Sequence, residues 1–216
     1  MNPDKDKKLI SPEEWETKRN KSTITRDQVN RIVMDYLYTT GCLEAAESFS
    51  KETRVELVED SNLEKRDSIR KAILSDEIDT AIKLVNEIDQ KVFENNQKLL
   101  FKLRLQKLVC YIKENKVIEA LAYGQEILAP SAKGNEELMS ELEKALSLIA
   151  FGCVENSPIG ELVSPLYKLK VSNDVNEEIL KLQGRGKNLV SVAIKELKWI
   201  EKRVGKSVNF PHCKFS

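Results

Sequence analysis

The residues that could carry nucleophilic, acid–base or metal chemistry are few in this chain of 216 residues. It has four cysteines and one histidine, namely Cys42, Cys110, Cys153, Cys213 and His212. A RING domain holds two tetrahedral zinc ions, and these side chains are too few to supply the ligands of both. A single zinc site would need four widely spaced cysteines to converge, and no Cys-x-x-Cys pair is present. We therefore expect no metal site.

The remaining candidates for catalysis are equally weak. His212 and Cys213 are adjacent in sequence, so their side chains need not face each other, and no cysteine lies in a recognisable acid–base setting. The Gly-Arg-Gly segment at 184–186 lacks the Lys-Ser/Thr and the preceding strand of a phosphate-binding loop, so it indicates a helix break. We expect no catalytic residue, no cofactor and no enzymatic activity.

The charge balance of the chain argues against some classes of binding partner. Lys and Arg total 35, and Asp and Glu also total 35, so the net charge is zero. This balance argues against a dedicated nucleic-acid binder and against capture by an anionic membrane. The apolar runs are only a few residues long, whereas a membrane span needs roughly 20, and the first residues lack the apolar core of a secretory signal. We expect a protein of cytoplasm and nucleus, with its cysteines reduced.

Helical spacing dominates the sequence. Apolar residues recur every three or four positions, and strand-like alternation is not sustained anywhere, which predicts an all-α fold of about ten helices. A first short helix should begin at Ser11 and Pro12 and carry Trp15, with a polar linker over 18–23 behind it. From about residue 63 to 128 the helices should be nearly continuous, and the one containing Phe101 should be central because it is apolar on several sides.

Caps and prolines predict the ends of the later helices. Asp76 and Asn115 are expected to cap the helices that follow them, and Pro130 should end the second of these.

Two further starts are expected beyond residue 150. Ser157 with Pro158 should open one helix, and Asn173 or Asp174 the next. A last helix should run over about 188–204, and the tail after it shows no helical pattern.

The most informative segment is a pair of short helices over 29–49. Thr25 and Gln28 form a capping box in front of them, and Gly41 lies where a helix end favours positive φ. Two short helices cannot bury such an apolar stripe alone, so we expect the hairpin to pair with a similar one in a four-helix arrangement. The apolar positions are Val29, Ile32, Val33, Tyr36 and Leu37 on the first helix, and Leu43, Ala46 and Phe49 on the second.

The same segment resembles a LisH motif. The Tyr36-Leu37 pair, Gly41, the Ala45-Ala46 pair and Phe49 follow in the family's order, although Cys42 stands where an aromatic residue is usual. Residues 64–88 and 106–128 look like the start and the close of a CTLH region, with Asp76 where the family usually has glycine. Residues 141–163 resemble the CRA region. The chain is thus similar to the LisH-CTLH-CRA family, with a leader over 1–24, LisH over 25–57, CTLH over 58–116, CRA over 117–204 and a tail over 205–216.

The resemblance implies a function in protein assembly. Family members build the ubiquitin ligase of the glucose-induced-degradation, or CTLH, type, so the implied role is a non-catalytic scaffold subunit that links RING-bearing and substrate-recruiting subunits for proteasomal degradation. The implied partners are RanBPM-like and RING-bearing LisH-CTLH-CRA proteins, an armadillo-repeat subunit and a second copy of this chain. The resemblance also implies that the last helix folds back on the hairpin. The expected interaction residues are Val29, Ile32, Val33, Tyr36, Leu37, Ala46, Phe49, Leu197 and Trp199.

Two other functions remain open from sequence. The hairpin could serve a LisH dimerisation adaptor of cytoskeletal or transcriptional type that is unrelated to ubiquitin. A helical RNA-associated protein is a third reading, and the zero net charge counts against it.

Overall fold

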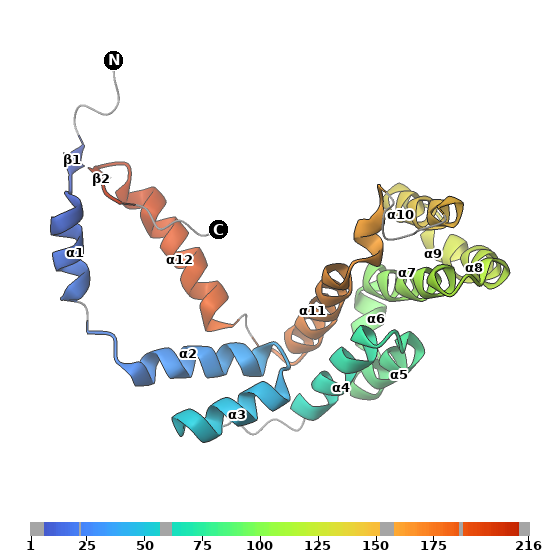
Figure 1. Cartoon of the computed structure of the whole chain (residues 1–216), viewed down its shortest axis with the longest axis horizontal. Helices are drawn as coiled ribbons and strands as arrows, with labels where there is room; N and C mark the ends of the chain where they lie inside the picture. The colour runs from blue at the N-terminus through green and yellow to red at the C-terminus, as the bar shows by residue number, and fades with distance from the viewer. Residues whose placement is uncertain (1–6, 22, 57–61, 152–157, 186–187, 212–216) are drawn as a thin grey trace, which may run out of the picture. The chain divides into compact units, whose positions relative to one another are not determined.

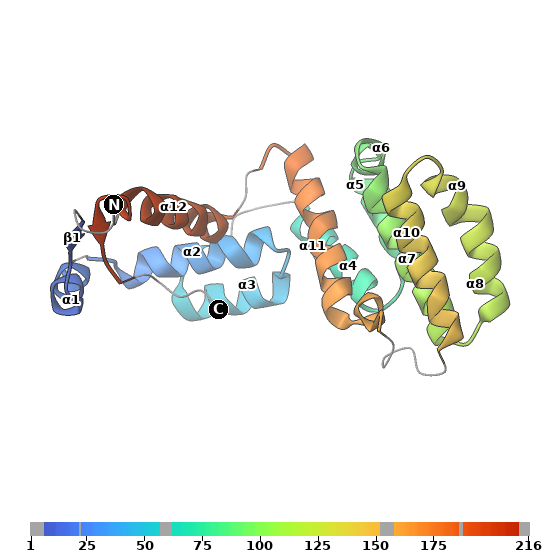
Figure 2. The same ribbon diagram turned by 90° about the horizontal axis from the view of Figure 1, so that it is seen from above.

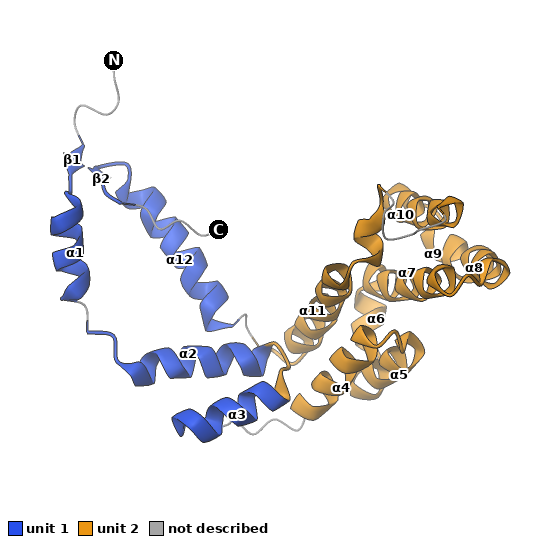
Figure 3. Cartoon of the chain, in the orientation of Figure 1, with its two compact units in different colours: residues 1–39, 44–58, 187–216 blue, residues 40–43, 59–186 orange. Residues whose placement is uncertain are grey.

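The computed structural model describes residues 7–21, 23–56, 62–151, 158–185 and 188–211, and nearly all regular structure in them is helical (Figure 1). The predicted all-α fold is confirmed. The chain divides into two compact units (Figure 3). Unit 1 comprises residues 1–39, 44–58 and 187–216, and unit 2 comprises residues 40–43 and 59–186.

Unit 1 is built from both ends of the chain. Its hairpin helices α2 and α3 run side by side in both ribbon views (Figures 1 and 2). The helix α12 packs against α2 although more than a hundred residues separate them in sequence. The elements are β1 (Lys8–Leu9), α1 (Pro12–Asn20), α2 (Arg26–Thr39), α3 (Leu43–Thr53), α12 (Leu189–Val204) and β2 (Val208–Asn209).

Unit 2 is a helical bundle. Its elements are α4 (Leu63–Leu74), α5 (Ile78–Ile88), α6 (Lys91–Asn95), α7 (Gln97–Lys113), α8 (Val117–Tyr123), the π-helical turn η1 (Gly124–Leu128), α9 (Ala129–Ala132), α10 (Glu136–Ser147), the 3-10 turns η2 (Leu148–Ala150) and η4 (Gly160–Val163), and α11 (Pro165–Leu182).

The long helix α7 is the centre of unit 2, as its apolar pattern predicts. Leu99 and Leu103 join one core cluster with α4, α5, α6 and α11. Phe101, Leu105 and Leu108 join a second cluster with α8, η1, α9, α10 and η4. A helix contacted on two sides must be apolar on two sides, which is why its sequence shows a broad stripe instead of a narrow one.

The turns at Asp76 and Asn115 differ from the prediction. Neither residue caps the following helix, because each takes the left-handed conformation instead, with φ of 66° and 57°. After α4, the amide of Glu77 donates to Ala72 O and the amide of Asp76 to Ile73 O, which is the Schellman pattern. Asn115 closes α7 in the same way. Asp and Asn are the non-glycine residues that tolerate this conformation best, so the tight turn forms without glycine.

Pro130 does not end its helix, contrary to the prediction. A proline inside a regular helix lacks an N–H and clashes with the carbonyl four residues earlier. Here the amide of Ala129 donates to Gly124 O, five residues back, which makes η1 a π-turn. Pro130 then occupies the first turn of α9, where no N–H is needed. The helical course therefore continues to Ala132.

Two predicted helix starts beyond residue 150 are also corrected. Ser157 lies outside the described residues, and the segment after Pro158 forms only the short turn η4. The helix begins at a second Ser-Pro pair, where the side chain of Ser164 accepts a hydrogen bond from the amide of Leu166 (3.2 Å). Asn173 lies inside this single helix α11, so the predicted break there is wrong. Its apolar stripe through Val175 and Ile179 packs on α4 without interruption.

The leader and the tail contain structure that the sequence pattern did not indicate. β1 and β2 pair in parallel, and the amide of Ile10 donates to Asn209 O (2.9 Å). Trp15 stacks on the buried ring of Phe210, with 5.3 Å between ring centroids. We call this arrangement of β1, Trp15, β2 and Phe210 the leader–tail tie. The helix α1 also continues to Asn20, through the first part of the expected linker, where Glu14 pairs with Lys18.

Candidate docking surfaces

The hairpin begins with the capping box that the sequence predicts. The amide of Gln28 donates to Thr25 Oγ1 (3.3 Å), and the amide of Thr25 donates back to Gln28 Oε1 (3.0 Å). These reciprocal bonds satisfy backbone donors that have no partner within the helix. They fix where α2 starts, and therefore which of its faces each apolar residue occupies.

The predicted stripe on α2 points outward from unit 1. Val29 and Tyr36 are 47% and 45% exposed, Ile32 is also exposed, and Val33 and Leu37 are half-buried. We call these five residues the hairpin stripe. The inward face instead carries Met34 and Tyr38, which are buried and which the sequence analysis did not single out. Their spacing of four residues was the available signal.

The second helix of the hairpin contributes less to the surface. Ala46 is fully buried inside the chain, so its expected place on an interaction surface is not supported by its position in the structure. Phe49 is half-buried. Gly41 has the positive φ (72°) that the helix end between α2 and α3 favours.

The helix α12 has apolar residues on two faces. Leu197 is half-buried, in line with Val190 and Ile194, and α12 packs on α2. The amide of Leu189 donates to Asp35 Oδ2 (2.6 Å), which ties the first turn of α12 to α2. The large apolar residues of α12 that are exposed, which we call the α12 face, are Leu189, Val192, Trp199, Ile200 and Val204.

Trp199 therefore lies on the exposed side of its helix. This residue is 58% exposed, and the guanidinium of Arg203 lies 5.0 Å from the centroid of its ring. A large indole left in water with only a cation–π contact is the kind of side chain that interfaces bury.

Unit 2 has a smaller apolar surface on α8. Ile118 is 81% exposed, and Leu121 and Ala122 are exposed beside it at the i+3 and i+4 positions. We call these three residues the α8 patch. Val117, Leu121 and Leu128 are apolar residues in the same helical stretch, but of these three only Leu128 is fully buried. A helix of two turns on the outside of the bundle has only one face covered.

The cysteines do not form a reactive centre within the described residues. Cys42 and Cys110 are free thiols, whereas Cys153, His212 and Cys213 lie outside the described part of the chain. Burial raises the pKa of the Cys110 thiol to about 12, and its hydrogen bond to Asp76 Oδ1 (3.1 Å) adds to the rise. Such a thiol stays protonated near neutral pH and is a poor nucleophile. In the described ranges, no group of three or more His, Cys, Asp or Glu could hold a metal ion.

The described helices also include none that is long and apolar enough to cross a membrane.

A helical hairpin precedes the two-core bundle in this chain. Residues 62–204 match the family described as the CTLH/CRA C-terminal to LisH motif domain, and the chain belongs to this family.

Its relatives carry more specific names. It is 33% identical over 208 residues to "Protein GID8 homolog" of Arabidopsis thaliana, a match that covers 95% of this chain and 86% of that protein. It is 31% identical to "Glucose-induced degradation protein 8 homolog" of Dictyostelium discoideum, which covers 95% of this chain and 91% of the relative. "GID complex subunit 8" of Schizosaccharomyces pombe is 31% identical over 183 residues, with 80% and 76% covered. The chain thus belongs among proteins named as subunits of the glucose-induced-degradation complex.

Proposed function

We propose that this chain is a non-catalytic scaffold subunit of a ubiquitin ligase of the glucose-induced-degradation type. It joins RING-bearing and substrate-recruiting subunits, so that ubiquitin transfer and substrate choice belong to its partners. The similarity to named complex subunits over most of the chain supports membership of the assembly.

One observation carries the scaffold role, namely the outward apolar faces of unit 1. The hairpin stripe and the α12 face expose large apolar side chains, including Val29, Tyr36 and Trp199. Isolated apolar side chains are ordinary on a protein surface, but stripes along two helices favour burial against another chain. A LisH-type hairpin from a sister subunit or from a second copy would complete a four-helix arrangement here.

The α8 patch supplies a second surface in the other unit. Ile118, Leu121 and Ala122 are exposed on one side of α8. A scaffold must hold at least two partners at separate places, and a surface in each unit meets this requirement. The proposed partners are RanBPM-like and RING-bearing relatives and an armadillo-repeat subunit, in cytoplasm and nucleus.

The test uses two charge insertions, each with a matched control. Tyr36→Asp changes the hairpin stripe, and Lys51→Asp changes an exposed site on α3. Ile118→Asp changes the α8 patch, and Glu119→Lys changes its exposed neighbour. A charge forced into an apolar interface costs about 2 kcal/mol or more, which weakens binding by more than tenfold.

Tagged chains are purified from the cells that make them, and the partners are quantified by mass spectrometry. We expect wild type and both controls to recover a RING-bearing subunit, and each insertion to lose a different set of partners. Recovery of no RING-bearing subunit with wild type contradicts the ligase assignment. Recovery of cytoskeletal or transcriptional LisH proteins in its place supports the adaptor alternative. If neither charge insertion changes the set of recovered partners, the proposal that these surfaces dock partners is contradicted.

A further inference from the structure

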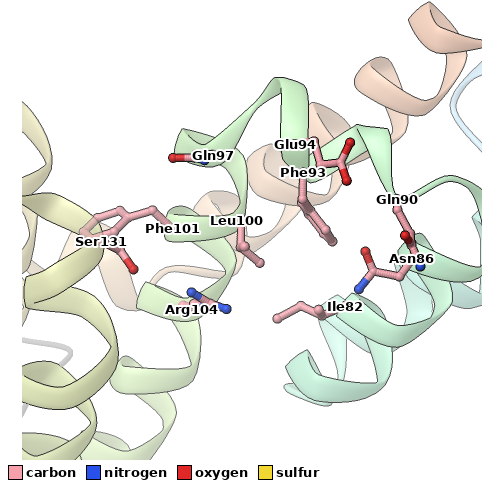
Figure 4. Close-up of a pocket in the computed structure, with 10 residues that line it drawn as sticks. All are labelled: Ile82, Asn86, Gln90, Phe93, Glu94, Gln97, Leu100, Phe101, Arg104 and Ser131. Carbon is pink, nitrogen blue, oxygen red and sulfur yellow. The ribbon is translucent and has the colours of Figure 1, made fainter.

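A groove on unit 2 is lined by apolar, amide and charged side chains and is separate from the α8 patch. It has a volume of about 520 Å³ and lies along α7 (Figure 4). Leu100 and Arg104 form its floor, Ile82 and Asn86 of α5 form one wall, and Ser131 of α9 lies on the other side. Its size is within the range of ligand and side-chain pockets in proteins.

The groove combines apolar and hydrogen-bonding side chains. Ile82 and Leu100 are half-buried at its centre, and Phe93 closes it from α6. The amide groups of Asn86 and Gln90 stand on the α5 side, both in exposed positions, and Figure 4 shows Asn86 directed toward the middle of the groove. Apolar contacts with a few amides at the edge are typical of a surface that binds another polypeptide.

Arg104 gives the groove a charge preference. Among the described residues, its guanidinium makes no ion pair and no side-chain hydrogen bond, although it is half-buried. Lys107, one turn further along α7, is different, because its ammonium pairs with Asp79 (2.6 Å) and lies over the ring of Tyr123. Glu94 lies at the opposite end of the groove from Arg104 in Figure 4, and no ion pair links the two. A half-buried guanidinium gains most from a carboxylate that reaches it from another molecule.

We propose that this groove binds one amphipathic helix of a partner protein, with a carboxylate of that helix on Arg104. The groove runs along α7 between α5 and α9, where a further helix would pack its apolar ridge between Ile82 and Leu100. The Asp or Glu of the partner would lie three or four residues from its apolar anchors, on the same face of the helix. This inference goes beyond the proposed function, because it holds whether or not the chain serves a ubiquitin ligase.

The test selects the ligand without assuming its identity. A phage library of helix-forming peptides of about 15 residues is panned on the full-length chain, since shorter helices are marginal in water. We expect enrichment of peptides that have one Asp or Glu and apolar residues three and four positions away from it. Fluorescence polarisation then measures their affinity, and Arg104→Glu should weaken it at least tenfold. The peptide with Lys in place of its acid should prefer Arg104→Glu over wild type.

Matched variants separate the groove from the general surface charge. Lys83→Glu makes the same change of charge at an exposed site of α5 that does not line the groove, so it should leave the affinity nearly unchanged. Circular dichroism reports whether Arg104→Glu is folded. Asn86→Ala and Arg104→Gln should weaken peptide binding by smaller factors than Arg104→Glu. They test the groove even if Arg104→Glu unfolds the chain.

Three results would overturn the proposal. They are a library that yields no binder, binders without an acidic residue, and acidic binders whose affinity is the same for wild type, Arg104→Gln and Asn86→Ala. Each result is independent of whether the chain joins a ligase, because the assay contains only the chain and a peptide.

Discussion

At the scale of residues, Asp76 connects four helices of unit 2. It stands between α4 and α5, accepts a hydrogen bond from Cys110 of α7, and pairs with Lys168 of α11. Burial alone would raise the pKa of Asp76, but the hydrogen bonds from Lys168 and Cys110 and the charges of Lys168 and Lys113 outweigh it, so the pKa lies below its usual value. Asp76 therefore forms the turn between α4 and α5 and also links this turn to α7 and α11.

The thiol of Cys110 should react slowly in the folded protein. Its pKa of about 12, against 9.0 for an ordinary cysteine, lowers the thiolate fraction at pH 8 by roughly a thousandfold. We expect iodoacetamide to label Cys110 at least a hundredfold more slowly in native chain than in urea, as measured by mass spectrometry of its peptide. Replacing Asp76 by Asn should raise the native rate in part. Equal rates in the two states would refute the assignment.

The raised pKa of Cys110 also makes the stability of the fold depend on pH. Above the pKa of an unfolded cysteine the native thiol still holds its proton, so unfolding releases protons there. The contribution of Cys110 is therefore fully present below about pH 9 and declines as the pH rises toward 12. Cys110→Ser should show a flatter decline in urea unfolding over that window than wild type does.

At the scale of elements, left-handed residues end several of the described helices of unit 2. Three helix ends have the Schellman hydrogen bonds, and their left-handed residues are Asp76, Asn115 and Gly184. Periodicity predicted the helices themselves because contacts at i+3 and i+4 are local. It did not distinguish a residue that starts a helix from one that ends the previous helix, because Asp and Asn favour both positions.

Asn115 offers a test of this assignment. Its side chain is exposed, and its φ of 57° is costly for a residue with an ordinary Cβ. We expect Asn115→Gly to be within about 0.5 kcal/mol of wild type and Asn115→Ala to lose about 1 kcal/mol of unfolding free energy in urea. Ser140→Ala, on an exposed face of α10, serves as the control. A loss in Asn115→Gly as large as that in Asn115→Ala would contradict the left-handed assignment.

At the scale of the whole molecule, the first and last described segments of the chain meet in the leader–tail tie. The tie rests on a two-residue strand pair and on the stacking of Trp15 and Phe210. No residue of α1 is buried, so this short helix depends on the tie and its own caps for its position. The tie also holds the end of α12, the helix that supplies the α12 face.

Removing one ring should loosen the tie without affecting α2. An aromatic pair contributes about 0.5–1.5 kcal/mol beyond its burial, so Trp15→Ala should speed amide hydrogen exchange at Lys8 and Ile10 by about two- to tenfold. Trp199→Ala removes an identical side chain from the exposed face of α12 and should leave those amides protected. Unchanged protection at Lys8 and Ile10 in Trp15→Ala would show that the strands alone hold the leader.

The sequence by itself determined the helical class, the capping box at Thr25, the apolar stripe along α2 and the central place of α7, because these depend on spacings of three or four residues that any helix must satisfy. Only the tertiary structure decided which apolar residues stay exposed. Ala46 and Leu121 have the same kind of local pattern, yet the first is buried and the second is not. The pairing of Trp15 with Phe210 and the contacts of Asp76 join residues distant in sequence. Such contacts leave no local period, since they arise only when helices from different parts of the chain pack together.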